Sequence, residues 1–183
     1  MNLIQQLDES ILFYILNHLH TPILDKIMIE LTSLGNSGFI WIAIAFLLLL
    51  YKKTRPCGIL LVTALSIEYI LGDGILKHLI ARNRPFIRFP DVPLLIKKPG
   101  SYSFPSGHTM SSFTAATVIF YFNKYAGIPA YLLAGLIGFS RLYLFCHYPL
   151  DVLSGAVFGI ATALMVFGAA RTIRLKAREN YQS

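Results

Sequence analysis

The chain has 183 residues, of which 55% are hydrophobic and only 14% are charged. Soluble domains carry about 25% charged residues, so this composition excludes an ordinary soluble protein and predicts an integral membrane protein. The length predicts a single domain over residues 1–183. The formal net charge is +7. Because the basic residues flank apolar runs, we expect them to face an anionic bilayer surface and an anionic substrate rather than nucleic acid.

The cysteines and the N-terminus indicate neither a disulfide or zinc site nor a cleaved signal peptide. Cys57 and Cys146 lie in or beside apolar runs and have no paired C-x-x-C spacing. This pattern argues against a disulfide or a zinc site and fixes no compartment. Residues 1–6 contain no basic residue, and no small-x-small site follows a compact apolar run. We therefore expect no cleaved signal peptide.

The N-terminal part of the chain predicts two helices of different kinds. Residues 2–20 place apolar side chains at helical spacing between polar ones, which predicts an amphipathic helix at the membrane interface. Pro22 restarts the chain, and residues 23–34 are a poor span because Asp25, Lys26 and Glu30 interrupt them. They would cross the bilayer only as a tilted helix buried by its neighbours. A Gly/Asn/Ser turn follows at residues 35–38.

Five later segments predict helices that cross the bilayer, whose core takes about 20 residues. These segments are residues 39–51, 57–76, 107–122, 127–145 and 149–170. Together with the doubtful segment before them, they predict an all-α, polytopic membrane bundle of about six transmembrane helices. Residues 77–104 form the longest polar connection. In the last helix, Gly155 and Gly159 form a G-x-x-x-G, a spacing as compatible with chance in a Gly-rich helix as with close helix packing.

The distribution of Lys and Arg predicts the orientation. If the helices alternate, the loop at 52–55, Lys124 and the basic tail at 171–178 share one side with eight Lys and Arg, against seven on the other side. Setting aside Lys77, Arg84 and Arg141 as functional residues changes this to eight against four. The first side is then cytoplasmic. The long polar connection is expected to face the outer side of the plasma membrane.

Three polar segments fall at helix ends on that outer side: residues 77–85, 105–108 and 140–151. Charged residues are costly inside lipid, so their presence here predicts a function. They supply three cations suited to binding phosphate oxygens, Lys77, Arg84 and Arg141. Ser106 is a suitable N-cap for the helix that begins near Gly107. Its hydroxyl and the free N–H groups of Gly107 and His108 would form an anion-binding cradle.

Two histidines and one aspartate complete this group. Pro149 suits the first position of a helix, which places Asp151 in the first turn and His147 just before it. Asp151 can then bind one imidazole nitrogen and leave the other free as a nucleophile. His108 can protonate the leaving group. These residues predict phosphoryl transfer by covalent catalysis, and no set of metal ligands is left over.

The motifs K-x₆-R-P, P-S-G-H and S-R-x₅-H-x₃-D, within residues 77–151, resemble the three motifs of the type 2 phosphatidic acid phosphatase superfamily. The resemblance implies a membrane lipid phosphatase that needs no metal ion or other cofactor. It implies that His147 forms a phosphohistidine, that Asp151 positions it and that His108 protonates the leaving oxygen. It assigns phosphate binding to Lys77, Arg84, Ser106, Gly107 and Arg141.

The implied substrate is an anionic lipid phosphate. Small members of the family resemble undecaprenyl pyrophosphate phosphatases, and phosphatidylglycerol phosphate or phosphatidate is the alternative substrate. An alternative of another class is a transporter or flippase for an anionic lipid, to which the intramembrane acids Glu68 and Asp73 would contribute. A structural membrane protein is a third interpretation. The sequence indicates no oligomeric state.

Several other polar residues receive simpler interpretations. We expect Arg82, Arg88, Lys97 and Lys98 to be charges at the lipid surface or on the path by which substrate arrives. Cys146 is expected to be a buried thiol rather than half of a Cys–His pair. Glu68 and Asp73 are expected to have buried polar partners in the bundle. His18, His20 and His78 lack a motif and are expected to be packing or surface residues.

Overall fold

The computed structural model describes residues 3–179, with side chains described as far as Ile173. This part of the chain is helical and contains no β-strand, so the all-α class is confirmed. The elements in chain order are α1 (Leu3–His18), α2 (Pro22–Leu34), the 3₁₀ turn η1 (Asn36–Gly38), α3 (Phe39–Leu50), α4 (Arg55–Tyr69), the π-helical η2 (Ile70–Leu76), α5 (Lys77–Ile80), α6 (Pro85–Arg88), α7 (Gly107–Phe122), α8 (Lys124–Tyr143) and α9 (Pro149–Glu179).

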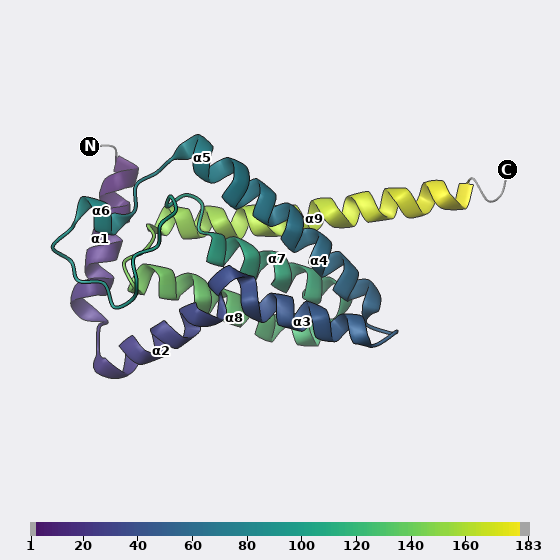
Figure 1. Cartoon of the computed structure of the whole chain (residues 1–183), viewed down its shortest axis with the longest axis horizontal. Helices are drawn as coiled ribbons and strands as arrows, with labels where there is room; N and C mark the ends of the chain where they lie inside the picture. Colours follow the sequence, from purple (N-terminus) through teal and green to yellow (C-terminus); the bar gives the residue numbers. More distant parts are fainter. Residues whose placement is uncertain (1–2, 180–183) are drawn as a thin grey trace.

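Helix α7 is the centre of the bundle, and α4, α8 and α9 pack around it (Figure 1). Its side chains from Thr109 to Ile119 are buried, apart from Phe113, on every side of the helix. Most of them are Ala, Ser and Thr, whose small size lets neighbouring helices approach closely. This pattern is typical of a helix in the centre of a bundle, which has no face exposed to solvent. The first turn of α7 carries the P-S-G-H motif, so this packing fixes the motif in place.

The G-x-x-x-G of α9 lies in the contact with α7. A methyl group on Gly155 would lie 2.8 Å from the carbonyl oxygen of Ser106, and one on Gly159 would lie 2.4 Å from that of Met110. Neither distance is compatible with a Cβ atom at these positions. The packing interpretation of this spacing is therefore confirmed.

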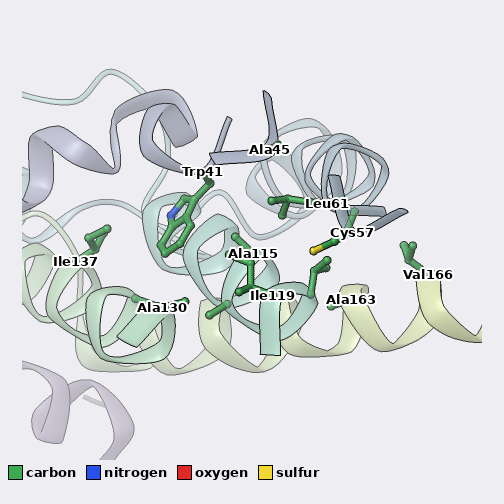
Figure 2. Packing of buried hydrophobic residues seen from close by; sticks show 14 residues of the cluster. Trp41, Ala45, Cys57, Leu61, Ala115, Ile119, Ala130, Ile137, Ala163 and Val166 are labelled. Atoms are coloured by element: carbon green, nitrogen blue, oxygen red, sulfur yellow. The ribbon is translucent and has the colours of Figure 1, made fainter. Parts of the chain in front are cut away.

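The main hydrophobic cluster joins α3, α4, α7, α8 and α9. Figure 2 shows Trp41 of α3 reaching toward α7, and Leu61, Ala115 and Ala163 belong to the same cluster. Trp41 is fully buried, and its Nε1 donates a hydrogen bond to Ser112 Oγ over 2.9 Å. This bond satisfies the one polar atom of the indole ring in an apolar environment. The cluster packs these five helices against one another.

Among the residues that the structure describes, three helical segments are long and apolar enough to cross a membrane: Arg55–Arg88, Lys124–Tyr143 and Pro149–Ile173. A fourth crossing is formed if Pro22–Leu34 and Asn36–Leu50, which meet at a 49° bend, act as one broken span. Helix α7 has only 16 residues, and at about 1.5 Å per residue it is shorter than the bilayer core. The chain is a membrane helix bundle, and the count of six spans remains a prediction.

Several predicted boundaries were wrong. The helix that begins at Arg55 does not stop at Leu76 but continues through η2 and α5 to Ile80. The helix predicted to begin at residue 127 begins at Lys124, because Asn123, which ends α7, also caps the start of α8, where its Oδ1 accepts bonds from the N–H groups of Tyr125 and Ala126. Helix α9 extends past residue 170 because Ala, Arg and Lys favour helix. The side chains of the predicted basic tail lie outside the described residues from 174 on.

The polar segments of the chain gather at one end of the bundle. Figure 1 places α1, α6 and the starts of α7 and α9 at this end, while the turn between α3 and α4 and the C-terminal part of α9 lie at the other. The prediction that alternation brings three distant motifs to the same end is thus confirmed. Helix α1 lies across this end and packs against α8 and α9. The structure contains the predicted N-terminal helix, and its position at a membrane interface remains a prediction.

Candidate active site

A cavity of about 980 Å³ opens at the polar end of the bundle. One wall is polar and contains Lys77, Arg84, His108, Arg141 and His147. The cavity continues between α3 and α4, where its wall is apolar and includes Ile42, Ala45, Val62 and Leu65. A site that is cationic at one end and apolar at the other fits an amphiphile with an anionic head.

His147 is held in a single orientation between α8 and α9. Its side chain is only 1% exposed, and Nη1 of Arg84 lies 2.9 Å from its Nε2. A guanidinium group can only donate, so Nε2 is the unprotonated nitrogen and the ring proton lies on Nδ1. Phe145 has a φ of 56°, a left-handed conformation that turns the chain before His147. The lone pair of Nε2 therefore lies next to the cation that borders the cavity.

Asp151 lies on the other side of the imidazole ring, in the first turn of α9. Its Oδ2 is 3.7 Å from Nδ1 of His147. The same oxygen accepts a hydrogen bond from Ser103 Oγ over 2.5 Å and one from the N–H of Tyr148 over 2.9 Å. Ser103 Oγ is also 3.4 Å from Nδ1. The predicted pair of His147 and Asp151 is brought together, with a serine that the sequence analysis did not identify.

The environment of His147 keeps the ring neutral. Burial, followed by the positive charge of Arg84, lowers the pKa of His147 to about 3, and the nearby carboxylate of Asp151 opposes this only in part. A neutral imidazole with its proton on Nδ1 is the nucleophilic form. Burial also raises the pKa of the Cys146 thiol, and its Sγ donates to the carbonyl of Leu144. The prediction that Cys146 is a buried thiol is confirmed.

The two arginines of the motifs are fixed by hydrogen bonds to neighbouring loops. Arg84 donates from Nε to the carbonyl of Ser101 over 2.6 Å, from Nη1 to that of Cys146 over 3.0 Å, and from Nη2 to Ser101 Oγ over 3.1 Å. Arg141 donates from Nη1 to Thr32 Oγ1 over 2.5 Å. Its Nε is buried without a partner among the described residues. A buried donor of this kind favours an anion as its ligand.

Lys77 and Gly107 meet across the cavity mouth. Nζ of Lys77 forms an ion pair with Asp73 of η2 and donates to Ser101 Oγ over 3.3 Å. A Cβ atom on Gly107 would lie 3.1 Å from Asp73 Oδ2 and 3.5 Å from Nζ of Lys77. Glycine at this position therefore lets the start of α7 approach the ion pair. Asp73 has the buried partner that the sequence predicted.

Ser106 and His108 differ in how they meet the cavity. Ser106 is the N-cap residue of α7 as predicted, but its side chain makes no capping bond. It is fully buried, accepts a hydrogen bond from Thr109 Oγ1 over 3.0 Å and does not line the cavity. His108 does line it, and its Nε2 is 3.0 Å from Asn36 Oδ1. The N–H groups of this first helical turn have no partner within the helix, as at any helix start.

Two simpler interpretations of charged residues need correction. Arg82 is not a lipid-surface charge, because its side chain is only 17% exposed and forms ion pairs with Asp151 and Asp8. Glu68 is buried as expected, but its Oε1 has no hydrogen-bond partner among the described residues. Lys97 and Lys98 line the cavity, consistent with a path for the substrate. Arg88 forms an ion pair with Glu9 over 2.8 Å.

Sequence reasoning missed several residues that hold the site. They are Asp8, Thr32, Asn36, Ser101 and Ser103. Only Asp8 carried a signal, since Gln5, Asp8 and Glu9 form a polar stripe on an amphipathic helix. The others are single polar residues in turns, loops or an apolar helix, and no spacing distinguishes them.

The arrangement is suited to phosphoryl transfer. Cations from three segments surround a nucleophilic nitrogen, and a second histidine faces the same cavity. Within residues 3–173, no three His, Cys, Asp or Glu side chains come together in a group that could hold a metal ion.

The fold and the site define a membrane-embedded phosphatase that acts on lipid phosphates. The profile of the PAP2 superfamily matches residues 55–174, and the chain belongs to this superfamily. It is 36% identical to an undecaprenyl-diphosphatase of Sulfolobus acidocaldarius over 81% of this chain and 71% of that protein.

Two solved structures have a similar fold. The crystal structure of a transmembrane PAP2 type phosphatidylglycerolphosphate phosphatase from Bacillus subtilis has a TM-score of 0.80 and 32% identity, covering 94% of this chain and 89% of that one. The crystal structure of Aquifex aeolicus LpxE has a TM-score of 0.78 and 33% identity, covering 88% of this chain and 95% of that one.

Proposed function

We propose that this protein hydrolyses the terminal phosphate of undecaprenyl pyrophosphate through a phosphohistidine on His147. The observation that carries this proposal is the unprotonated Nε2 of His147, next to Arg84 at a cavity that continues into an apolar groove. The groove would take the isoprenoid chain, and the cations would bind the diphosphate. The reaction would require no metal ion and no other cofactor.

The first step forms a bond between Nε2 of His147 and the terminal phosphorus and breaks the bond from phosphorus to the bridging oxygen. Lys77, Arg84 and Arg141 bind the phosphoryl oxygens, together with the N–H groups at Gly107. Asp151 stabilises the positive charge that develops on the imidazole ring. His108, which becomes protonated when the anionic phosphate lies beside it, gives that proton to the leaving oxygen. Water then attacks the phosphohistidine with His108 as the base, which releases inorganic phosphate and restores Nε2.

We propose that the Ser106 hydroxyl has a role other than phosphate binding. Because it is buried behind the cavity and bound to Thr109, it orients the first turn of α7 rather than contacting phosphate in this conformation. Contact with the substrate would require it to rotate. The backbone N–H groups beside it are then the part of the predicted cradle that an anion reaches first.

The choice of substrate rests on the relatives and on the charge of the site. Undecaprenyl-diphosphatase is the name of the relative from Sulfolobus acidocaldarius, and Lys97 and Lys98 add positive charge for a second phosphate. Phosphatidylglycerol phosphate is the second candidate, because a phosphatase of that lipid shares the fold over nearly the whole chain. Comparing kcat/KM over a panel of lipid phosphates and diphosphates distinguishes these substrates.

The mechanism is tested with purified protein in EDTA. We expect release of inorganic phosphate from undecaprenyl pyrophosphate. We expect His147→Ala to abolish this release, because the variant lacks the proposed nucleophile, Nε2. His18→Ala is the matched control, because His18 is exposed on α1 and is bound to its own helix. Undiminished turnover by His147→Ala would contradict the mechanism. No turnover on any lipid phosphate would instead favour a transporter.

A further inference from the structure

The carboxylate of Asp151 is bound on two sides, of which only one faces His147. Oδ2 faces the imidazole ring and Ser103, while Oδ1 accepts a hydrogen bond from Nη1 of Arg82 over 2.7 Å. The Asp151 side chain is fully buried. A buried carboxylate requires a counter-charge and filled acceptor positions. Arg82, which does not line the cavity that contains His147, supplies both.

Arg82 is in turn held by α1. Its Nη2 donates to Asp8 Oδ2 over 2.6 Å and to Gln5 Oε1 over 2.8 Å. Its Cζ lies 4.1 Å above the ring of Tyr148. Partners at both ends of the guanidinium fork and on its face fix the plane of the group.

Asp8 also holds the start of α9. It is 4% exposed, and its Oδ1 accepts a hydrogen bond from the N–H of Leu150 over 2.9 Å. This N–H belongs to the first turn of α9, where no intrahelical partner exists. One carboxylate of α1 thus binds both Arg82 and the backbone next to Asp151.

We propose that Asp8 and Arg82 are positioning residues of the phosphatase reaction. Asp8 holds Arg82, and Arg82 fixes Oδ1 of Asp151 so that Oδ2 stays directed at Nδ1 of His147. Helix α1, which precedes all three motifs, is then part of the active site's architecture as well as a surface helix. This inference rests on the proposed role of His147 as the nucleophile.

The position of these residues determines which kinetic constant they affect. Neither Asp8 nor Arg82 lines the cavity that contains His147. A misplaced Asp151 carboxylate would stabilise the imidazole less as Nε2 bonds to phosphorus, which raises the barrier of that step. Phosphate binding by Lys77 and Arg141 would be unchanged. Loss of Asp8 or Arg82 therefore lowers kcat and leaves KM nearly constant.

The test compares Asp8→Asn, Arg82→Gln and Arg82→Lys in full-length protein with the best substrate of the lipid panel. We expect Asp8→Asn and Arg82→Gln to lower kcat by about 10–100-fold, the size of effect found when a group that orients a metal-binding side chain is removed. Arg82→Lys keeps the charge and should recover part of the loss. If Asp8 acts through Arg82, the double variant Asp8→Asn/Arg82→Gln should be no slower than Arg82→Gln alone.

Glu9→Gln is the matched control. Glu9 lies next to Asp8 on α1 and forms an ion pair of the same type, with Arg88 at 2.8 Å rather than with Arg82. Its Oε1 also accepts a hydrogen bond from Gln5 Nε2, and a glutamine at this position keeps an oxygen that can accept it. We expect Glu9→Gln to keep the wild-type kcat. An equal fall in Glu9→Gln and Asp8→Asn would show that α1 docking alone matters, and would overturn the positioning role.

Two further results would overturn the proposal. One is wild-type kcat in folded Asp8→Asn, a variant that keeps the size of the side chain and an acceptor for the Leu150 N–H. The other is a loss confined to KM. Each variant is first compared with wild type in Tm and elution volume. If the wild type is active and Asp8→Asn has the same kcat, only the positioning role is contradicted. If the wild type is inactive on every lipid phosphate, the proposed function is contradicted as well.

Discussion

At the residue scale, the burial of His147 has a consequence for stability as well as for chemistry. In an unfolded chain, histidine has a pKa of about 6.5, whereas burial and Arg84 lower the pKa of His147 to about 3 in the folded protein. Between these values only the unfolded state binds the proton. The contribution of His147 to stability is therefore complete above pH 6.5 and is lost as the pH falls toward 3.

We expect this loss to reach about 2 kcal/mol between pH 7 and pH 5, at about 1.4 kcal/mol per pH unit below 6.5. His147→Gln removes the titrating group, so its thermal unfolding should depend less on pH than that of the wild type. The other histidines are common to both proteins and cancel. The chain has a single tryptophan, the buried Trp41, whose fluorescence reports unfolding. Parallel pH profiles for the two proteins would contradict the buried, neutral state of His147.

One part of the site could be predicted from the sequence and another could not. His147, Asp151 and Pro149 lie within one short segment, so helix geometry alone predicts that the carboxylate is close to the ring. Arg82 and Asp8 are 74 residues apart. Their contact depends on where α1 docks, which no local pattern encodes. Arg82 also follows Lys77 in the same basic segment, so nothing in its surroundings separates a buried ion pair from a surface charge.

At the element scale, the contact between α7 and α9 determines where two of the motifs lie. A Cβ atom on Gly159 would lie 2.4 Å from the Met110 carbonyl oxygen and 3.0 Å from the Thr114 nitrogen. Both are backbone atoms of the central helix and cannot rotate away. We expect Gly159→Ala to destabilise the protein by about 1–3 kcal/mol, the usual cost of overpacking a core. In a chain of this length, the Tm should fall by about 2–4 °C per kcal/mol.

Gly168→Ala in the same helix is the control for this prediction. A methyl group at Gly168 meets no heavy atom within 4 Å, and alanine favours helix over glycine by about 1 kcal/mol. Its Tm should equal or slightly exceed that of the wild type. Equal Tm values for Gly159→Ala and Gly168→Ala would show that α9 can move away from α7 without loss.

Helix positions were more predictable than helix ends. The apolar runs located the helices, because burial in lipid or in the bundle requires them. The ends depend on single hydrogen bonds, such as the cap that Asn123 gives to α8, and on continuity through the π-helical η2. The π-helix carries Asp73 to the cavity beside Lys77, and its wider turn leaves no mark in the hydrophobic pattern.

At the scale of the whole molecule, alternation of helices was sufficient to bring the motifs together. The long connection between α6 and α7 and the short turn between α8 and α9, which carry motif residues, lie at the same end of the bundle (Figure 1). The number of crossings was less predictable, because α7 is short and buried on all sides and because α2 and α3 meet at a bend of 49°. Hydropathy measures how apolar a segment is and cannot distinguish contact with lipid from contact with other helices.

The orientation of the bundle in the membrane can be tested by labelling. We propose that the end of the bundle with His147 faces outward from the plasma membrane, because fewer non-functional basic residues lie there. Tyr102→Cys would place an exposed thiol at this end, and Lys53→Cys would place one at the opposite end. A maleimide that cannot cross membranes should label Tyr102→Cys in right-side-out vesicles and Lys53→Cys in inside-out vesicles.

The native thiols do not obscure this experiment. Cys57 and Cys146 are both buried, and burial raises the pKa of the Cys146 thiol, so little reactive thiolate is present there. The wild-type chain should therefore remain unlabelled in both kinds of vesicle. The reverse pattern, with Lys53→Cys labelled from outside, would place the cavity on the cytoplasmic side.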